Sequence, residues 1–416
     1  MPRHDRRPAT VLLAFGLFIV SLLLSPVWLA ADAMAGEDGS LRAKDFRMAG
    51  DAARTRIVLN FDKPFQPKWF LLSKPFRLVI DMPTAAFAVD PANTRAKGLV
   101  SIVRYGRFDD ARSRMILGGN APFAVESIDV LKNDDGSGHR LAIDLAASSA
   151  EAFDQALARQ SGLKAEIRTA PKDDRLGARQ RSADGSHPFT VVLDPGHGGI
   201  DGGARSVGGA VEKNITLAFA IGLKKKLEQA GDIRVFLTRD DDRFLRLSER
   251  VALARQYEAD LFISVHADTI RFRSVRGATV YTVSDEASDE VAHAIASSEN
   301  LADQLAGIAP EEASHEVADI LLDLMRRETQ TFSIRFARSL VGEMSHTVEL
   351  IKNPHRFAGF RVLTAPDVPS VLLELGYLSN PKDESLLRDP KWRDKAGDSI
   401  VAAVKKYAAA HAEMGG

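Results

Sequence analysis

The hydrophobic pattern of this 416-residue chain changes its period part-way along, and this change most limits the folds available to it. From about residue 41 to 145, apolar residues alternate with polar ones. From residue 188 to 411, short apolar runs alternate with stretches whose apolar side chains recur at helical spacing. Because a period of two is typical of half-buried strands and a period of 3.6 of amphipathic helices, the sequence predicts a small all-β domain followed by an α/β domain.

The first region, residues 41–146, is predicted to form a β-sandwich. Residues 104–108 mix cations and aromatics, which is typical either of a surface for carbohydrate or carboxylate ligands or of a solvated edge strand. The alternating apolar positions that mark the expected strands are Ile57/Leu59/Phe61, Phe76/Leu78/Ile80, Phe123/Val125 and Leu141/Ile143/Leu145.

Residues 147–187 are rich in Ala, Ser, Arg, Gln and Asp, and Phe153 is their only aromatic residue. This composition predicts a linker. Its first part, residues 151–160, has the character of a short helix.

Residues 188–411 predict a mostly parallel sheet with helices on both faces. Ligands of such sheets gather at the carboxyl ends of the strands, so polar residues at those ends are the first candidates for a functional site. Strands are expected at residues 190–193, 235–238, 261–265 and 370–373, and helical spacing occurs at Ile215/Phe219/Leu223/Leu227 and Ile400/Val401/Val404/Ala408.

The N-terminus predicts export. Three arginines precede an apolar run over residues 11–24, which Pro26 and small residues at 31, 33 and 35 follow. This order is that of a cleaved signal peptide covering residues 1–35, after which no stable membrane span remains. The alternative is a membrane anchor, since the apolar stretch approaches the ~20 residues that span a bilayer. The Arg6-Arg7 pair lacks the surrounding twin-arginine motif, so both the Sec and the twin-arginine routes stay open.

Charge and cysteine content exclude several functions. With 55 basic and 56 acidic side chains the formal net charge is −1, so nothing in the overall charge attracts nucleic acid. The chain has no cysteine. Thiolate zinc sites, cysteine nucleophiles and disulfides are therefore excluded.

Three residues at predicted strand or helix ends suggest a metal site. His197 lies in a glycine-rich loop after the first strand, Glu212 lies just before a helix, and His266 ends a buried strand. Each has a structural alternative: Glu212 is typical of a residue that stabilises the helix dipole, and a strand-end histidine is often hydrogen-bonded in the core. The loop matches neither nucleotide-binding glycine pattern. Two histidines and a glutamate at one sheet edge favour hydrolytic zinc, which commonly keeps a fourth position open for water.

Glu374 ends another apolar strand, where an unpaired carboxylate is costly to bury. It is interpreted as the general base of the reaction, with a partner of a ligand histidine as the alternative.

Four segments, residues 194–199, 212–213, 264–268 and 374–380, resemble the motifs of zinc-dependent N-acetylmuramoyl-L-alanine amidases with a type-3 catalytic domain. The resemblance covers residues 188–411, and the preceding β region resembles, more loosely, the AMIN-type targeting domain. It implies that His197, Glu212 and His266 hold one Zn²⁺ per chain and that Glu374 is the catalytic carboxylate. Supporting positions around the ligands are implied for Asp268, Arg239 and Arg250.

The resemblance implies hydrolysis of the amide between N-acetylmuramic acid and the L-alanine of the peptidoglycan stem. It further implies a role in cell-wall remodelling and daughter-cell separation in the periplasm of a Gram-negative bacterium. Two alternatives remain: a zinc endopeptidase or carboxypeptidase acting on stem peptides, and a non-catalytic wall-binding scaffold.

Residues 284–332 form an insert between the strand containing Tyr281 and a helix expected to begin near Ile334. Two helices are expected in it, one through Val291, Ile295, Ala302 and Leu305 and one through Val317, Ile320, Leu321 and Leu324. They are either extra packing or a lid. Similar inserts in the division-associated branch of the family hold a helix over the zinc until an activator of the LytM-like type displaces it. That resemblance singles out Glu299 as an inhibitory zinc contact, with Asp289, Glu290 and Asp303 as competitors.

Overall fold

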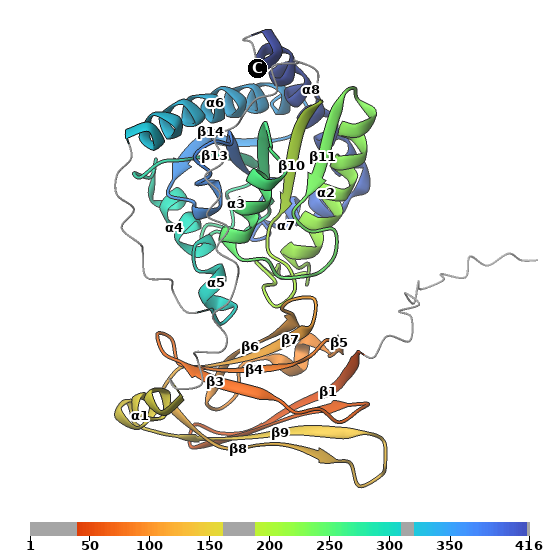
Figure 1. Cartoon of the computed structure of the whole chain (residues 1–416). Helices are drawn as coiled ribbons and strands as arrows, with labels where there is room; N and C mark the ends of the chain where they lie inside the picture. The colour runs from red at the N-terminus through yellow and green to blue at the C-terminus, as the bar shows by residue number, and fades with distance from the viewer. Residues whose placement is uncertain (1–39, 161–187, 309–319, 414–416) are drawn as a thin grey trace, which may run out of the picture. The chain divides into compact units, whose positions relative to one another are not determined.

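The computed structural model of the chain describes residues 40–160, 188–308 and 320–413 (Figure 1). The predicted export signal, residues 1–35, lies outside these residues, as do positions 161–187 of the predicted linker. Within the described ranges, no helix has both the length and the apolar character that crossing a membrane requires.

The first region folds into two antiparallel sheets, apart from one parallel pair between β1 and β5. A five-stranded sheet has the order β5-β1-β2-β9-β8 and a four-stranded sheet the order β3-β4-β7-β6. The strands are β1 (Leu41–Gly50), β2 (Arg54–Phe61), β3 (Lys68–Leu72), β4 (Arg77–Pro83), β5 (Ala85–Ala88), β6 (Val100–Arg107), β7 (Arg112–Gly119), β8 (Phe123–Lys132) and β9 (His139–Ala147), with a 3-10 turn at Pro91–Thr94. β6, which carries most of residues 104–108, is an edge strand.

The two sheets share one apolar core, because period-two alternation sends every second side chain of each strand inward. Ile57 and Leu59 of β2, Leu78 and Ile80 of β4 and Leu117 of β7 are all buried there. This confirms the predicted sandwich. The helix expected in residues 151–160 is α1 (Ala150–Gln160), whose Phe153 packs into the same core.

The second region contains a six-stranded sheet of order β11-β10-β12-β15-β13-β14. All neighbouring strands are parallel except β13 and β15, which confirms the mostly parallel sheet. The strands are β10 (Phe189–Pro195), β11 (Ile233–Leu237), β12 (Leu261–His266), β13 (Ala278–Val283), β14 (Leu350–Ala358) and β15 (Ser370–Glu374).

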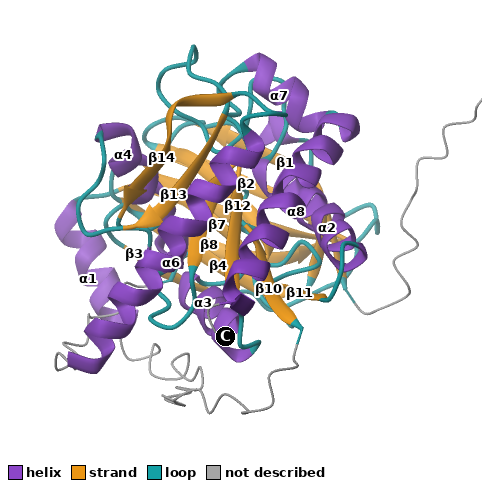
Figure 2. Ribbon diagram, turned by 90° about the horizontal axis from the view of Figure 1, so that it is seen from above, coloured by secondary structure: helices purple, strands orange, loops and turns teal. Residues whose placement is uncertain are grey.

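Helices cover both faces of this sheet (Figure 2). Val191 and Leu193 of β10 point toward one face, where they meet α2, α6 and α8, whereas Val192 points toward the other, where α3, α4 and α5 pack. α2 and α8 lie side by side. The helices are α2 (Glu212–Gln229), α3 (Leu247–Gln256), α4 (Glu290–Glu299), α5 (Ala302–Leu305), α6 (Ile320–Met344), α7 (Pro381–Arg388) and α8 (Pro390–Glu413), with a 3-10 turn at Arg361–Leu363.

The insert differs from its prediction in two ways. Its first expected helix is interrupted at Asn300 and Leu301 and so forms α4 and α5. The separate helix expected near Ile334 was wrong, because α6 runs without a break from Ile320 to Met344. Neither glycine nor proline occurs between residues 321 and 341, so nothing in the local sequence ends a helix there. Val317 lies outside the described residues.

Candidate metal centre

The carboxyl ends of three neighbouring strands bring the predicted polar residues together. His197 follows β10, His266 ends β12 and Glu374 ends β15. The register pairs His266 directly with Glu374, and Pro195 of β10 with Val265 of β12. The parallel sheet therefore places one residue from each motif at the same edge, as the pattern of apolar strands predicts.

The glycine-rich loop lets His197 turn into the site. His197 has a φ of +60°, in the left-handed region that non-glycine residues seldom adopt. A Cβ at Gly196 would lie 2.5 Å from the His266 ring, and one at Gly203 would lie 2.5 Å from the His197 ring. Any larger residue at these positions would displace an imidazole, so the glycines are needed for close approach.

Glu212, the first residue of α2, faces both imidazoles. Its Oε2 lies 3.1 Å from His197 Nε2, and its Oε1 lies 3.3 Å from His266 Nδ1. The carboxylate is fully buried and accepts hydrogen bonds from two backbone amides, Ala204 N at 2.7 Å and Ala267 N at 2.8 Å. These bonds fix both oxygens beside the two histidines.

Glu299, the last residue of α4, reaches the same two nitrogens. Its Oε1 lies 3.6 Å from His197 Nε2 and its Oε2 lies 3.3 Å from His266 Nδ1. His197, His266 and Glu299 form a buried group whose ligand atoms lie within 4.8 Å of one another, which is consistent with a bound metal ion.

The other three acidic candidates of the insert lie elsewhere. Asp289 caps α4 and lies 3.1 Å from Arg356 Nη1, while Glu290 is exposed. Asp303 accepts a hydrogen bond from the backbone amide of Leu247, at the start of α3. Glu299 is therefore the carboxylate of these four that the structure brings to the histidines.

The chemistry of the donor set fits a divalent cation. His197 Nε2 and His266 Nδ1 are buried and have no hydrogen-bond partner among the described residues, although carboxylate oxygens surround them. Orphaned imidazole nitrogens beside several buried carboxylates are costly unless a cation binds between them. The other nitrogen of His197, Nδ1, lies 2.8 Å from Asp201 Oδ2, which is the usual arrangement behind a metal-bound histidine.

Asp201 was not singled out from the sequence. The only available signal was a carboxylate four residues after a loop histidine, a spacing that carries meaning only once the loop has folded back on itself. Burial opposes its charged form, but the imidazole of His197, together with Arg104 and the backbone amide of Gly203, holds the pKa of Asp201 well below its usual range.

Burial and neighbouring charges shift the pKa values of the site residues in opposite directions. Burial disfavours the charged form of His197, yet the carboxylates of Glu212, Asp201 and Glu299 raise the pKa of His197 well above its usual value. Burial raises the pKa of Glu299, and the two histidines only partly offset it. The buried carboxylates of the site therefore outnumber its two imidazoles, and burial disfavours the charged form of both kinds of group.

Glu374 is fully buried, and one of its oxygens is unengaged among the described residues. Oε2 accepts a hydrogen bond of 2.9 Å from the backbone amide of Asp268, whereas Oε1 has no partner within the described ranges. Burial, followed by the nearby carboxylate of Asp268, raises the pKa of Glu374 well above its usual value. A carboxyl group with a raised pKa and a free oxygen is suited to accept and return a proton near neutral pH.

Comparison with known proteins decides the family. Residues 191–406 match the family model described as N-acetylmuramoyl-L-alanine amidase, and residues 45–145 match that of the AMIN domain. The chain belongs to the N-acetylmuramoyl-L-alanine amidase family. It is an amidase that hydrolyses peptidoglycan, with an AMIN domain before its catalytic domain, as the resemblance implied.

Relatives of this amidase match along most of its length. N-acetylmuramoyl-L-alanine amidase AmiC of Neisseria meningitidis serogroup B is 34% identical over 85% of this chain and 86% of the relative. AmiC of Escherichia coli O6:H1 is 29% identical over the same shares. Among solved structures, AmiC2 of Nostoc punctiforme covers 53% of this chain and 97% of its own, at 25% identity and a TM-score of 0.39.

Two buried arginines brace the histidine loop of the amidase. Arg239 donates to the carbonyl oxygens of Pro195 and Gly196 at 2.9 and 2.8 Å. Arg250 donates to the carbonyl oxygens of Pro195 and His197, each at 2.9 Å. Within the described residues, both side chains hold the backbone from which His197 projects and do not hydrogen-bond a candidate ligand atom.

Proposed function

We propose that this amidase uses one zinc ion, held by His197, Glu212 and His266, to cleave the amide between the lactyl group of N-acetylmuramic acid and L-alanine. The observation that carries the proposal is the pair of buried imidazole nitrogens that have no hydrogen-bond partner among the described residues and face Glu212 at the edge where Glu374 ends its strand. Glu212 is favoured as the permanent carboxylate ligand because two backbone amides fix it at the start of α2.

The ligand residues and Glu374 would then have different roles in the reaction. His197, Glu212 and His266 would hold the zinc ion, which when bound would supply an acidified water and polarise the scissile carbonyl. Glu374 accepts a proton at its free Oε1 while the Asp268 amide keeps Oε2 in place. The same carboxyl returns the proton to the alanine nitrogen, which leaves as an amine.

Product analysis tests this reaction. Purified peptidoglycan is digested with the protein, and released peptides are sequenced by mass spectrometry. Stems with a free N-terminal L-alanine are expected. Peptides cut within the stem would instead support an endopeptidase or carboxypeptidase, and binding without cleavage by protein that lacks stoichiometric metal would support a scaffold.

We further propose that Glu299 closes the site at rest. Its two oxygens lie 3.6 and 3.3 Å from the two imidazole nitrogens, so it competes for the position that a catalytic zinc leaves open for water. α4 is anchored in this position: Ile295 is buried against the sheet, and the Asn300 side chain bonds the backbone at Gly359 and Arg361. An activator of the LytM-like type would then act by drawing α4 away.

Replacing Glu299 tests the closed state. Glu299→Ala removes the competing carboxylate and leaves the anchors of α4, so basal cleavage of peptidoglycan is expected to rise about tenfold, one decade for each 1.4 kcal/mol. Glu290→Ala, an exposed carboxylate in the first turn of the same helix, is the matched control. Equal rates for Glu299→Ala and the wild type would remove the inhibitory role of Glu299.

The setting proposed for the enzyme is the periplasm of a Gram-negative bacterium, where it would remodel the wall and help daughter cells separate. The N-terminal sequence pattern supports export, and the match to AmiC amidases of Escherichia coli and Neisseria meningitidis supports action in a Gram-negative cell envelope. The AMIN domain would bring the catalytic domain to peptidoglycan. Fractionation of cells producing the tagged chain tests the location, with cytoplasmic retention as the contrary result.

A further inference from the structure

The segment between β12 and β13 presents two cations and an aromatic ring to solvent. Arg271, Phe272 and Arg273 are all exposed, and the Phe272 side chain is 57% accessible. The backbone amide of Val275 bonds the carbonyl oxygen of Phe272, so this part of the segment is a tight turn. We refer to residues 271–273 as the RFR turn.

Two hydrogen bonds, one just before the RFR turn and one within it, join it to the segment that follows Glu374. Before it, the amide of Ile270 donates to Ser379 Oγ at 3.2 Å. Within it, the Asn380 side chain donates to the carbonyl oxygen of Arg273 at 2.7 Å. The turn therefore has a fixed backbone set on residues of the catalytic motif.

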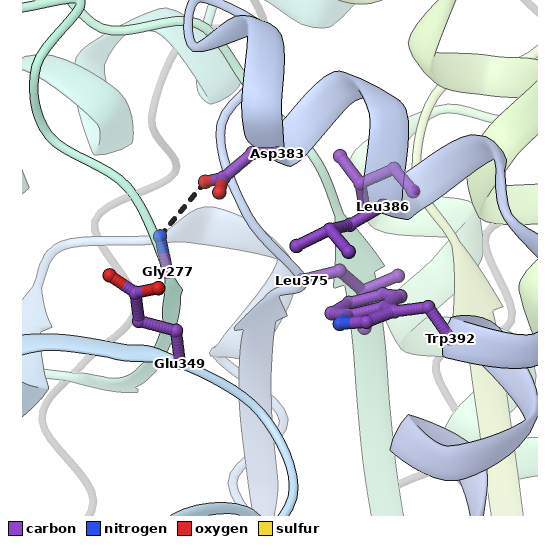
Figure 3. Close-up of a pocket in the computed structure, with 7 residues that line it drawn as sticks. Gly277, Glu349, Leu375, Asp383, Leu386 and Trp392 are labelled. Atoms are coloured by element: carbon purple, nitrogen blue, oxygen red, sulfur yellow. Dashed lines mark hydrogen bonds between the residues drawn. The ribbon is translucent and has the colours of Figure 1, made fainter.

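The base of the turn is fixed as well. Beyond it, the amide of Gly277 donates to Asp383 Oδ2 at 2.8 Å, and Figure 3 shows this bond at the wall of a small cavity. The same oxygen accepts from the amide of Tyr377, three residues after Glu374. Asp383 thus joins the loop base to the catalytic strand.

Arg276, the third arginine between β12 and β13, has a structural role that Arg271 and Arg273 lack. Arg276 is half-buried and paired, with Nη2 at 2.7 Å from Glu349 and Nε at 3.4 Å from Asp383. In the part of the chain that the structure describes, neither Arg271 nor Arg273 forms an ion pair. These two guanidinium groups are available to an anion, and Phe272 lies between them in the sequence.

The RFR turn lies close along the chain to the residue that holds Glu374. Arg271 is three residues from Asp268, whose amide holds Glu374. At ~3.3–3.6 Å per residue the two Cα atoms are at most about 11 Å apart. By the same measure, the second and third residues of a stem peptide lie roughly 7 to 11 Å from the amide before its first residue.

We propose that the RFR turn is a carboxylate-binding subsite that recognises the acidic residues of the stem peptide next to the scissile amide. Arginine offers a planar pair of donors that matches a carboxylate, and Phe272 offers an apolar surface for the intervening chain. This proposal rests on the proposed function, because the subsite is placed relative to the amide that the enzyme cuts.

The test compares two substrates in full-length protein carrying Glu299→Ala. One is an N-acetylmuramoyl tripeptide with free carboxylates, and the other is the same compound with those carboxylates converted to amides. The acidic substrate is expected to have a kcat/KM about fivefold higher, near the upper limit for an exposed ion pair. Arg271→Gln with Arg273→Gln should abolish this preference through KM, and high salt should reduce it.

Arg234→Gln is the matched control, because Arg234 is an exposed arginine of β11 near the amino end of that strand, in the same sheet. A preference that survives the double substitution, or that Arg234→Gln removes equally, would overturn the proposal. Calorimetric binding of the free stem tripeptide separates this outcome from failure of the proposed function. Weaker binding to the double variant supports the subsite even if the amide is not cut, and unchanged binding contradicts it.

Discussion

Two clusters of buried charge lie close together in the sequence, one at the end of β10 and one in the loop that follows it, and they differ in how completely their polar atoms are paired. Asp194 accepts hydrogen bonds from Thr238, Ser264 and Arg250 at 2.6, 2.7 and 2.7 Å. Three residues later, His197 begins a cluster in which two imidazole nitrogens and one oxygen of Glu374 have no partner among the described residues. Burial of charge is thus common to both clusters, and the open atoms distinguish the one suited to chemistry.

The difference has an energetic meaning. A buried charge whose partners are all present is stable in place, and removing one partner leaves the others uncompensated. A buried cluster with an excess of carboxylates is unfavourable by itself and becomes favourable when a cation binds. Substitutions in the first cluster should therefore act on folding, and those in the second on metal binding and catalysis.

The largest effect is expected at Glu374. Glu374→Gln keeps an acceptor for the Asp268 amide but cannot take up a proton, so kcat should fall about 10²- to 10⁴-fold, the usual contribution of a general base. Thermal unfolding should occur at the same or a higher temperature, because a buried carboxylate with a raised pKa is replaced by a neutral group. Glu349→Gln, at a largely exposed glutamate, is the control. Retention of more than a tenth of wild-type turnover would exclude Glu374 as the base.

The next effect concerns the paired cluster. Asp194→Ala leaves Arg250 buried without its carboxylate, and the free energy of unfolding should fall by about 3–5 kcal/mol. Urea denaturation measures this, with Asp232→Ala at an exposed position expected to change stability by less than about 0.5 kcal/mol. Metal bound per folded chain should not change. A variant of normal stability that had lost its metal would reverse the assignment of the two clusters.

The smallest effect is expected at the boundary of the metal cluster. Asp201→Asn keeps a hydrogen-bond acceptor for His197 Nδ1 but removes its charge, so zinc affinity should fall about 10- to 100-fold. Competition with a chromogenic chelator measures this, and Asp240→Asn, at an exposed aspartate, is the control. Unchanged affinity would mean that Asp201 only shapes the loop.

Several parts of the fold and site followed from the sequence because they depend on local pattern. Strand ends located His197, His266 and Glu374, since parallel strands place their carboxyl ends at one edge. Period-two alternation located the β-sandwich strands, including β2 and β9. The end of the insert was predicted wrongly for the opposite reason: a helix through Ile320 and Leu324 and another beginning near Ile334 were expected to be separate, although no residue between them ends a helix, and α6 is continuous.

By itself, the sequence determined the two folds, the motif residues and the strand ends on which those residues lie, because apolar periodicity and chain direction fix these locally. Only the tertiary structure decided which atoms are left without partners. It brought Glu299 from a helix some 30 residues after His266 to the same two nitrogens, and it sent Asp289, Glu290 and Asp303 elsewhere. It also placed Asp201 behind His197. Such contacts depend on long-range packing, which residue spacing along the chain does not specify.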